Sequence, residues 1–333
     1  MPPRVCVIIP AYNSSAHLPR AIQSVRRQTV PAEEIIVVDD GSTDDTVAVA
    51  RMHGAHVITQ KNAGPAAARN TGISAASAEW IAFLDADDTW MEAKLERQLH
   101  AASLAPQAGM IFSDFLFFDD HGTHRKTGLE LSGAAHAVLR SHLDRDIWLC
   151  ERESLGEALL AAMFILTSSL MIRRDVLSQG EAFDTEMRCA EDYDLFLRLS
   201  TRTDAAFIDE ALVAYRRHSE SITVDLDLDV RSRDQLIARC AAHPERYPKR
   251  AANHLMLQRA HWIARAASFA LRSGDFAAAR RRAEQSLRAR PNTQALCALT
   301  IAHLCDNRTG RALHLLLRTL WSHRPSKYQS VKP

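Results

Sequence analysis

Residues 81–90 read "IAFLDADDTW", a stretch in which an apolar run ends in a cluster of acids. The run Ile81-Ala82-Phe83-Leu84 has the composition of a buried strand, and Asp85, Asp87 and Asp88 follow it at once. Two carboxylates about 4 Å apart repel each other by roughly 4 kcal/mol at an effective dielectric near 20. A fold tolerates such a cluster when the acids reach water, share a proton or hold a cation. The stretch therefore predicts a strand that delivers acids to a functional edge of the fold.

Other apolar runs of strand length surround this stretch and indicate the fold class. They lie at residues 5–9, 35–40, 56–59 and 110–118. Helical patterns separate the runs, and the first of these has apolar residues at Leu18, Ala21, Ile22 and Val25. Strands that are apolar on both faces and are joined by single helices predict a mostly parallel sheet with helices on both faces. The sequence therefore predicts an α/β fold.

The residues that follow four of these strands are polar, acidic or turn-forming. They are Pro10-Ala11-Tyr12-Asn13, Asp39-Asp40-Gly41-Ser42, Asn62-Ala63-Gly64 and Asp85-Ala86-Asp87-Asp88. In parallel sheets, ligands bind in the crevice beyond the carboxyl ends of the strands. We therefore expect the four segments to converge on one ligand site.

A different pattern begins near residue 230, after which no strand signal remains. We expect an α/β domain over residues 1–225 and an all-α extension over residues 226–333. Part of the extension resembles a single tetratricopeptide-type repeat. The residues that carry this likeness are Gly274, Phe276, Ala283 and Pro291. One repeat cannot bury its own apolar face, so we expect it to dock on the first domain or on a partner.

The net charge of +1 hides a division between the two regions. Residues 231–333 contain 20 Lys and Arg against 5 Asp and Glu, a net charge of +15, while residues 1–230 carry −14. Such a division predicts an acidic cleft and a basic surface. No nucleic-acid-binding motif accompanies the basic region, so a nucleic-acid partner is not expected.

The cysteines and the apolar segments favour a cytoplasmic protein. The six cysteines are scattered without a Cys-x-x-Cys pair, which indicates neither a disulfide framework nor a zinc site. The longest apolar stretch, residues 158–172, is shorter than the roughly 18 residues of a spanning helix, and Thr167-Ser168-Ser169 interrupts it. The N-terminal apolar run is too short for a signal peptide. We expect residues 158–172 to be a buried segment and not a membrane span.

Neither of the glycine-rich nucleotide motifs, Gly-x-Gly-x-x-Gly and Gly-x-x-x-x-Gly-Lys-Ser/Thr, occurs in the sequence. Acids at strand ends can nevertheless hold a divalent cation, which binds a diphosphate through one or two carboxylates and the phosphate oxygens. For Asp85 and Asp87 together we favour such a metal site over a helix cap. For Asp88, a cap on the helix expected near Met91 is an equal alternative.

Five motifs follow one another along the first two thirds of the chain. They read "VIIPAYN" at 7–13, "IIVVDDGSTDDT" at 35–46, "NAGPAAARNTG" at 62–72, "FLDADD" at 83–88 and "AEDYDLFLRL" at 190–199. Their order and spacing resemble glycosyltransferase family 2 over about residues 4–220. The resemblance implies the GT-A fold and an inverting transfer of a sugar from a nucleotide-diphosphate sugar, with UDP favoured, to a hydroxyl acceptor. The implied setting is the synthesis of surface polysaccharide or glycoconjugates.

The resemblance also implies how the donor is bound. The implied donor-binding residues are Pro10, Ala11, Tyr12, Asp39, Asp40, Gly64, Arg69, Asp85 and Ala86. Asp40 is the better match for the acid that hydrogen-bonds the base, and a carboxylate suits the imide N–H of uracil or thymine. Arg69 is expected to reach a phosphate or Asp87, with an exposed position on its helix as the alternative.

A divalent cation, Mn²⁺ or Mg²⁺, is implied in the same way, with Asp87, Asp85 and His218 as the residues that hold it. Asp87 is the expected direct ligand, and His218 matches a late histidine that contacts the metal or the diphosphate. Such a cation acts as a Lewis acid for the departing group. Lone histidines are more often structural, which is the alternative for His218.

Sugar transfer with inversion needs a base that takes the proton of the acceptor hydroxyl. Residues 191–199 predict a helix with Leu195 and Phe196 on its buried stripe, and helical spacing puts Asp192 over the same face. The base of the family also falls on Asp192, with a first-turn carboxylate as the alternative. The residues expected on the acceptor side are Glu191, Thr167 and Ser168; hydroxyls in a core strand are the alternative for the last two.

Two other functions stay open from the sequence. One is a non-catalytic nucleotide-sugar-binding or scaffold protein that acts through the helical extension. The other is a nucleotidyltransferase, which would need a Gly-rich loop with Arg or Lys where this chain has "PAYNSS" at 10–15.

The expected partners are a nucleotide-sugar donor and a saccharide or lipid-linked acceptor. The basic region suits an anionic membrane at the inner face of the cell membrane, an anionic acceptor or docking on the acidic domain, and we favour the membrane. A homo-oligomer also stays open.

Overall fold

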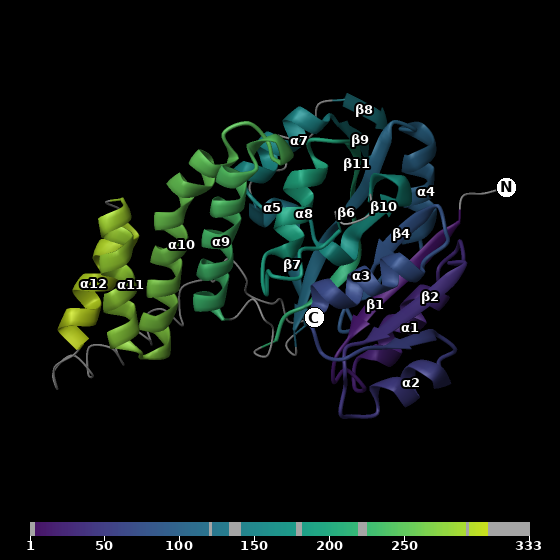
Figure 1. The fold of residues 1–333 in the computed structure, drawn as a ribbon, viewed down its shortest axis with the longest axis horizontal. Helices are drawn as coiled ribbons and strands as arrows, with labels where there is room; N and C mark the ends of the chain where they lie inside the picture. The colour runs from purple at the N-terminus through teal and green to yellow at the C-terminus, as the bar shows by residue number, and fades with distance from the viewer. Residues whose placement is uncertain are drawn as a thin grey trace. The chain divides into compact units, whose positions relative to one another are not determined.

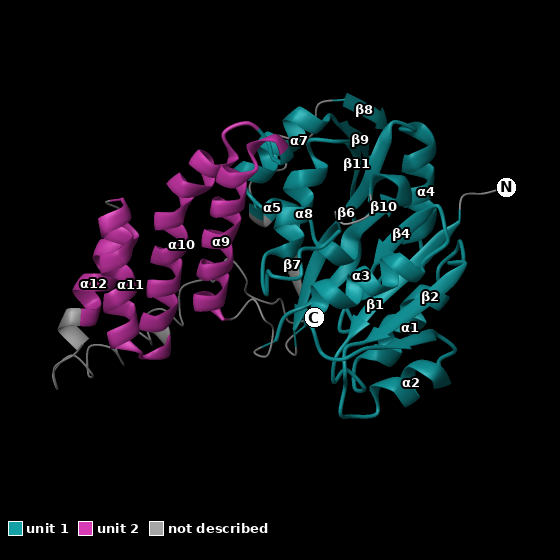
Figure 2. Ribbon diagram, viewed as in Figure 1, with its two compact units in different colours: residues 1–219, 246–248, 330–333 teal, residues 220–245, 249–329 magenta. Residues whose placement is uncertain are grey.

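The structure, a computed structural model, describes residues 4–119, 122–132, 141–177, 182–218, 225–290 and 293–305. These residues form two compact units (Figure 2). The first consists of the described residues as far as 218 together with Arg246–Pro248, and the second of residues 225–245 and 249–305. The predicted boundary between residues 225 and 226 lies beside a stretch outside the described ranges, and it stays a prediction.

The N-terminal half of the first unit is a parallel sheet with the strand order β3-β2-β1-β4 (Figure 1). Its strands are β1 Val5–Ala11, β2 Glu34–Asp39, β3 His56–Thr59 and β4 Trp80–Phe83. The helices around it are α1 Leu18–Arg26, α2 Thr46–Met52, α3 Pro65–Ala75 and α4 Lys94–Leu104. The apolar runs and helical patterns predicted all of these elements, and the predicted α/β class is confirmed.

Helices cover both faces of this half of the sheet, as strands that are apolar on both faces require. Val7 and Ile9 of β1 pack with Leu18 of α1 in one core cluster. Ile8 alternates to the opposite face, where α3 lies so close that a Cβ atom on Gly72 would come within 2.5 Å of Ile8 Cγ2. The glycine therefore allows α3 to pack directly against β1.

The other half of the sheet is mixed. The order continues from β4 as β10-β6-β11-β9-β8, with β5 paired to β11 and β7 paired to β6. These strands are β5 Thr89–Trp90, β6 Ala108–Asp119, β7 Gly122–Thr127, β8 Ser141–Asp144, β9 Ile147–Cys150, β10 Leu170–Arg173 and β11 Asp204–Arg216. β10 is antiparallel to both β4 and β6, whereas β6 and β11 are parallel. An apolar run that is buried on both faces has the same pattern in either direction, so the sequence did not predict this reversal.

The apolar segment 158–172 forms several short elements and not one long helix. Helix α7, Arg152–Ala161, ends within it, the 3-10 turn η1 spans Thr167–Ser169, and β10 follows. Most of its apolar side chains are buried, as predicted. Across the described ranges, no helix is long and apolar enough to cross a membrane. The short helices α5, Gly128–Ser132, and η2, Arg174–Val176, also belong to the first unit.

Helix α8, Glu191–Leu199, is enclosed on nearly every side, and Asp192 is its one residue that is not buried. The predicted stripe of Leu195 and Phe196 is present, but Glu191 and Asp194 are buried as well, at 8% and 1% exposure. Helical spacing therefore does not separate Asp192 from its acidic neighbours, and the inward orientation predicted for Asp192 stays a prediction. Asp192 is the acid of this helix that keeps access to solvent.

The described part of the second unit is all α, as predicted (Figure 1). Its helices are α9 Leu226–Ala242, α10 Ala251–Ser273, α11 Phe276–Ala289 and α12 Thr293–Cys305, and a short turn, η4 Pro244–Arg246, follows α9. Gly274, with φ +83°, ends α10, and the Asp275 carboxylate accepts a hydrogen bond from Ala278 N in the first turn of α11. The tetratricopeptide-like character of this helical pair stays a prediction, and Pro291 lies outside the described residues.

Candidate active site

The acidic loop Asp85–Asp88, directly beyond β4, is held in place by its own acids and by η1. The Ser168 hydroxyl donates to Asp88 Oδ2 at 2.6 Å and accepts from Asp85 N at 3.0 Å. The other oxygen of Asp88 accepts from Arg216 N at 2.9 Å. Asp88 is completely buried, and burial followed by the charges of Asp85 and Asp87 raises the pKa of Asp88 well above its ordinary value. Asp88 therefore has a structural role in fixing the loop.

Two expectations change with this geometry. Asp88 does not cap the following helix, because α4 begins at Lys94 and Ala93 occupies the cap position. Ser168 was expected on the acceptor side, but its side chain is fully buried and bonded to the acidic loop. The Ser168 hydroxyl thus belongs to the interior, in line with its alternative interpretation as a core hydroxyl, whereas the acceptor-side role of Thr167 stays a prediction.

Asp87 and His218 meet beyond the strand ends, with His218 Nε2 2.9 Å from Asp87 Oδ2. Their side chains are 28% and 23% exposed. Burial raises the pKa of Asp87 above its ordinary value and the charge of Asp85 adds to this rise, while His218 opposes it. No group of three or more metal-ligating side chains converges within the part of the chain that the structure describes. Carboxylate and imidazole ligands nevertheless suit Mn²⁺ or Mg²⁺ when phosphate oxygens and water complete the coordination shell.

Arg69 lies between two acids and not beside Asp87. Its two terminal nitrogens donate to Asp85 Oδ1 at 2.7 Å and to Glu191 Oε1 at 2.8 Å. Arg69 is only 5% exposed, so the alternative of an exposed helix position is wrong. Burial alone would lower the pKa of Arg69, but the charges of Asp85 and Glu191 raise it above its ordinary value. The guanidinium therefore stays charged and joins the acidic loop to helix α8.

Asp192, the predicted base, lies beside this ion pair. Thr167 Oγ1 donates to Asp192 Oδ2 at 3.4 Å, and Tyr193 N donates to Asp192 Oδ1 at 2.7 Å. Burial and then the charge of Glu191 raise the pKa of Asp192 to about 7, against the opposing effect of Arg69. A carboxylate that titrates near neutral pH and is accessible to solvent can accept a proton from a bound hydroxyl group.

The two acids after β2 differ in how they are bonded. Asp40 Oδ1 accepts from Gln60 Nε2 at 2.8 Å and Ala63 N at 2.9 Å, and its Oδ2 accepts from Gly64 N at 2.8 Å. These donors fill three of the roughly four acceptor positions of a carboxylate and leave one on Oδ2. Asp39 has only long contacts of 3.3 and 3.4 Å from Ser42 N. Both acids are buried, at 4% exposure each, and both keep acceptor positions that no protein donor fills at short distance.

The other residues expected at the donor differ in exposure. Tyr12 is 51% exposed, whereas Ala11 and Ala86 are buried in the core cluster. Pro10 is partly buried within β1. Gly64 precedes α3 with φ +91°, and no atom lies within 4 Å of the position that a Cβ would take. Tyr12 and the Gly64 backbone are thus the accessible contacts on this side of the site.

The sequence model of glycosyl transferase family 2 matches residues 6–176, about half of the chain. The chain belongs to glycosyl transferase family 2.

One sequence relative and two solved structures are similar to this chain. ExoO of Rhizobium meliloti (strain 1021), a succinoglycan biosynthesis protein, is 31% identical over 198 residues, which are 58% of this chain and 54% of ExoO. The chain thus spans about half the length of this relative. S. aureus TarS 1–349 in complex with UDP-GlcNAc has a TM-score of 0.60 at 15% identity, covering 98% of this chain and 94% of that one. The mannosyltransferase PcManGT from Pyrobaculum calidifontis, in complex with GDP-Man and Mn²⁺, has a TM-score of 0.54 at 16% identity, covering 97% and 89%. These two likenesses show the fold, which is the predicted GT-A fold.

Sequence reasoning missed two residues of this family 2 site. His17 Nε2 lies 2.8 Å from Arg216 Nη1, and burial followed by the charge of Arg216 lowers the pKa of His17 below its ordinary value. Gln60 donates to Asp40 and accepts from Thr71 Oγ1 at 2.6 Å. A lone His before a helix looks like a surface residue in the sequence. Gln60, by contrast, follows the third strand directly, where polar residues were already expected.

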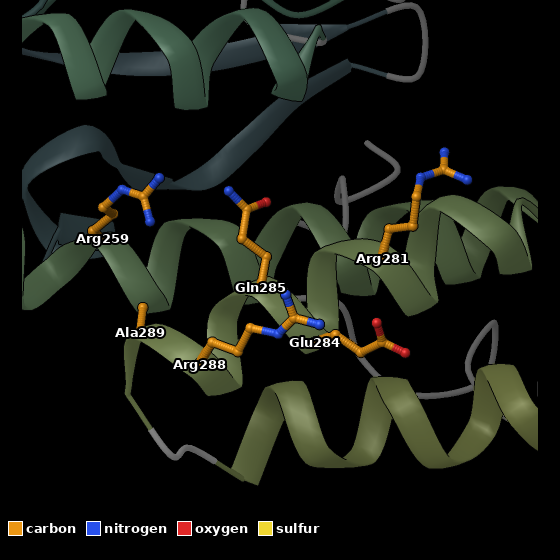
Figure 3. Close-up of a pocket in the computed structure, with 6 residues that line it drawn as sticks. All are labelled: Arg259, Arg281, Glu284, Gln285, Arg288 and Ala289. Atoms are coloured by element: carbon orange, nitrogen blue, oxygen red, sulfur yellow. The ribbon is translucent and has the colours of Figure 1, made fainter.

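The second unit contains a pocket of roughly 460 Å³ on α10 and α11 (Figure 3). Its lining residues are Arg259, Arg281, Glu284, Gln285, Arg288 and Ala289. Arg259 is paired with both carboxylate oxygens of Asp234, at 2.6 and 2.8 Å. Arg281 and Arg288 are exposed on α11, so they contribute to the basic surface that the charge of the extension predicts.

Proposed function

We propose that this chain is an inverting glycosyltransferase that moves a sugar from a nucleotide-diphosphate sugar, with UDP favoured, to a hydroxyl acceptor. The observation that carries this proposal is the position of Asp192, the one residue of α8 that is not buried and a carboxylate with a pKa of about 7. It adjoins Arg69, which contacts the acidic loop beyond β4. A base and a set of donor-side acids therefore belong to one connected site, as a single displacement requires.

The proposed reaction uses Asp192 to accept the proton of the acceptor hydroxyl. The acceptor oxygen attacks the anomeric carbon from the face opposite the diphosphate. The bond from that carbon to the diphosphate oxygen breaks, and its electron pair leaves with the nucleoside diphosphate. Configuration at the anomeric carbon is inverted. Only ionised Asp192 accepts a proton, so the step needs the deprotonated form.

The donor half of the site has the groups that a nucleotide sugar needs. Asp40 and Asp39 accept from the base, and the exposed ring of Tyr12 offers a stacking surface. Asp87, Asp85 and His218 would hold a divalent cation, which stabilises the negative charge of the departing diphosphate when it is bound. The complexes of TarS with UDP-GlcNAc and of PcManGT with GDP-Man and Mn²⁺ support this assignment by similarity of fold.

Thermal unfolding with UDP, dTDP or GDP, each with and without Mn²⁺, tests the donor half directly. A ligand at about 100 times its dissociation constant adds roughly 2.7 kcal/mol of stability to the folded state. We expect one nucleotide to raise the unfolding temperature in the presence of Mn²⁺, and Asp87→Asn to abolish that rise. If no nucleotide raises it, the non-catalytic scaffold alternative replaces this proposal.

The acceptor is proposed to be a saccharide or a lipid-linked saccharide in surface-polysaccharide synthesis. The similarity to ExoO, a succinoglycan biosynthesis protein, supports this setting. The proposed location is the cytoplasm, with peripheral contact at the inner face of the cell membrane.

The basic pocket on α10 and α11 supports the proposed membrane contact. Arg281 and Arg288 can attract phosphate groups of anionic lipids, each worth about 1 kcal/mol near such a surface. We expect the full chain to co-sediment with phosphatidylglycerol vesicles at low salt. The double variant Arg281→Glu/Arg288→Glu should lose this binding. Arg231→Glu, an exposed arginine of α9 outside the pocket, is the matched control. Absence of vesicle binding by the unmodified chain at low salt would exclude the contact.

A further inference from the structure

Arg69 connects two segments that lie far apart in the sequence. Its contacts reach Asp85, in the acidic loop beyond β4, and Glu191, the first residue of α8, which is 122 positions away. Both carboxylates are within 2.8 Å of the guanidinium. One buried side chain thus touches a proposed metal ligand and the residue next to the proposed base.

The position of Arg69 is fixed by its surroundings. Its guanidinium lies 5.1 Å from the ring centroid of Phe183. Phe183 is held by Asn70, whose side chain both donates to Phe183 O at 2.7 Å and accepts from Phe183 N at 2.9 Å. The same ring packs edge-on against Phe83 at the end of β4, with the centroids 5.4 Å apart. Contacts from Phe183, which is itself held by Asn70 of α3 and Phe83 of β4, therefore fix the position of Arg69.

The Nε atom of Arg69 shows which contacts decide its orientation. This N–H group is buried and has no acceptor among the described residues. An unmet buried donor is costly, so a side chain that was free to turn would satisfy it. The two carboxylates keep the guanidinium in an orientation that leaves Nε without a partner.

The start of α8 is held by contacts of its own acidic residues and not by a cap. Ala190 precedes the helix in the left-handed region, with φ 62° and ψ 18°, and its side chain provides no cap. A residue with a side chain is strained in this conformation and adopts it only when the surrounding structure imposes it. In the first turn, Tyr193 N donates to Asp192 Oδ1 at 2.7 Å and the Tyr247 hydroxyl donates to Asp194 Oδ1 at 2.6 Å. The contact from Arg69 to Glu191 is the buried ion pair that joins this helix start to α3, whereas the buried pair of Arg198 with Asp194 lies within α8.

We propose that Arg69 and Glu191 are positioning residues that hold the first turn of α8, and Asp192 with it, in register with the acidic loop at Asp85. This inference rests on the proposed function, in which Asp192 is the base and the acidic loop binds the donor. The pair acts through its geometry and touches neither reacting group. The same ion pair then holds both the acidic loop and Asp192 in place.

The charges around Asp192 give this link a second measurable effect. The titratable groups that act on it are Glu191 of α8, Arg69 of α3 and Asp85 of the acidic loop; Glu191 and Asp85 raise its pKa and Arg69 lowers it. Glu191→Gln keeps an oxygen that can accept from Arg69 but removes a negative charge next to Asp192. The acidic limb of the kcat profile should therefore shift to lower pH in this variant, while the donor KM stays within about threefold of the original value.

Arg69→Lys tests the geometry of the link, because an ammonium group keeps the charge but cannot bridge two carboxylates with a planar fork. We expect kcat to fall by about 100-fold, as a misplaced base predicts, with a smaller rise in donor KM because the acidic loop is loosened as well. The double variant Arg69→Lys/Glu191→Gln should lose no more than Arg69→Lys alone, since Arg69→Lys breaks the link and Glu191→Gln changes only the charge of the same link. Arg173→Lys is the matched control, because Arg173 forms a surface ion pair with Asp175 away from the site.

Amide hydrogen exchange of this chain provides a readout without turnover. If the link holds both segments, Arg69→Lys will speed exchange in residues 85–88 and in residues 190–194 together, and Arg173→Lys will speed neither. Faster amide exchange in only one of the two segments would contradict the link. A loss of nucleotide affinity as large as the loss of kcat would contradict it as well. The failure of the proposed function looks different: the unmodified chain would then transfer no sugar, or Asp192→Asn would retain sugar transfer, whatever Arg69→Lys does.

Discussion

His218 and Asp87 are 131 positions apart in the chain, yet Nε2 of one lies 2.9 Å from Oδ2 of the other. The cause is the short antiparallel pairing of β5 with β11, in which Ala214 lies opposite Thr89. Continued in this register, the end of β11 runs past the acidic loop, and Arg216 N donates to Asp88. A two-residue strand thus delivers the late histidine to the proposed metal ligand.

Replacement of His218 should weaken the binding of the cation but leave the fold unchanged. His218→Ala removes one of the few proposed protein ligands, and we expect the Mn²⁺ affinity in the presence of the preferred nucleotide to fall about tenfold. Titration of Mn²⁺ by isothermal calorimetry measures this. His56→Ala is the control, because His56 pairs with Glu34 outside the site, 2.9 Å away. Equal affinities in the two variants would remove His218 from the metal site.

Asp192 should make the protein less stable as the pH rises through neutrality. Its pKa is about 7 in the folded chain, above the value of about 3.9 expected when unfolded. Between these values the folded state holds a proton that the unfolded state has lost, so this contribution to stability falls as the pH increases. Asn does not titrate, so its contribution to stability does not change with pH. We therefore expect the unfolding temperature of Asp192→Asn, relative to that of the original chain, to be about 3 °C higher at about pH 8 than at about pH 5. The exposed Asp175→Asn serves as control, and a constant difference for Asp192→Asn would contradict the assigned pKa.

Substitution of Asp40 and substitution of Asp39 should differ in their effects on folding stability. Asp40→Ala leaves the N–H groups of Ala63 and Gly64 without their acceptor, which should cost about 1–3 kcal/mol of folding stability as well as nucleotide affinity. Asp39→Ala removes only long contacts to Ser42 and should cost less stability. Denaturant unfolding and nucleotide titration of both variants measure the two effects. Nucleotide binding that is unchanged in both would show that neither acid contacts the base.

The packing of α3 on β1 should depend on Gly72. A Cβ atom there would lie 2.5 Å from Ile8 Cγ2, so Gly72→Ala must push α3 away from the sheet. We expect a loss of about 1–3 kcal/mol of stability, together with lower activity because α3 carries Arg69. Gly64→Ala is the informative comparison, since its φ of +91° makes Ala strained although the space around it is open. A Gly72→Ala variant as stable as the original chain would mean that α3 is not held closely against β1.

The sequence predicted the elements of the N-terminal half-sheet because its strands are apolar on both faces and each helix has a clear stripe. It also predicted Asp87, His218 and Asp192 as neighbours of one site, and the structure brings Asp87 to His218 and Asp192 to the Arg69 ion pair. It did not predict that Asp88 and Ser168 would bond to each other in the interior, because the burial of each depends on a partner 80 positions away in the chain. Helical spacing also failed at α8, where every other residue is buried and Asp192 occupies the one partly buried position. Local periodicity cannot show that a helix is covered on all sides.

Release of free nucleotide from a panel of UDP-, dTDP- and GDP-sugars in the presence of Mn²⁺ tests the central claim most directly. The unmodified chain should consume one class of donor. Asp192→Asn should bind the same nucleotide with the same thermal shift but release it more slowly, by about 100- to 10,000-fold, the usual effect of a general base. Turnover of Asp192→Asn at the rate of the unmodified chain, or failure of the unmodified chain to consume any donor, would contradict the claim that this family 2 protein is a glycosyltransferase with Asp192 as its base.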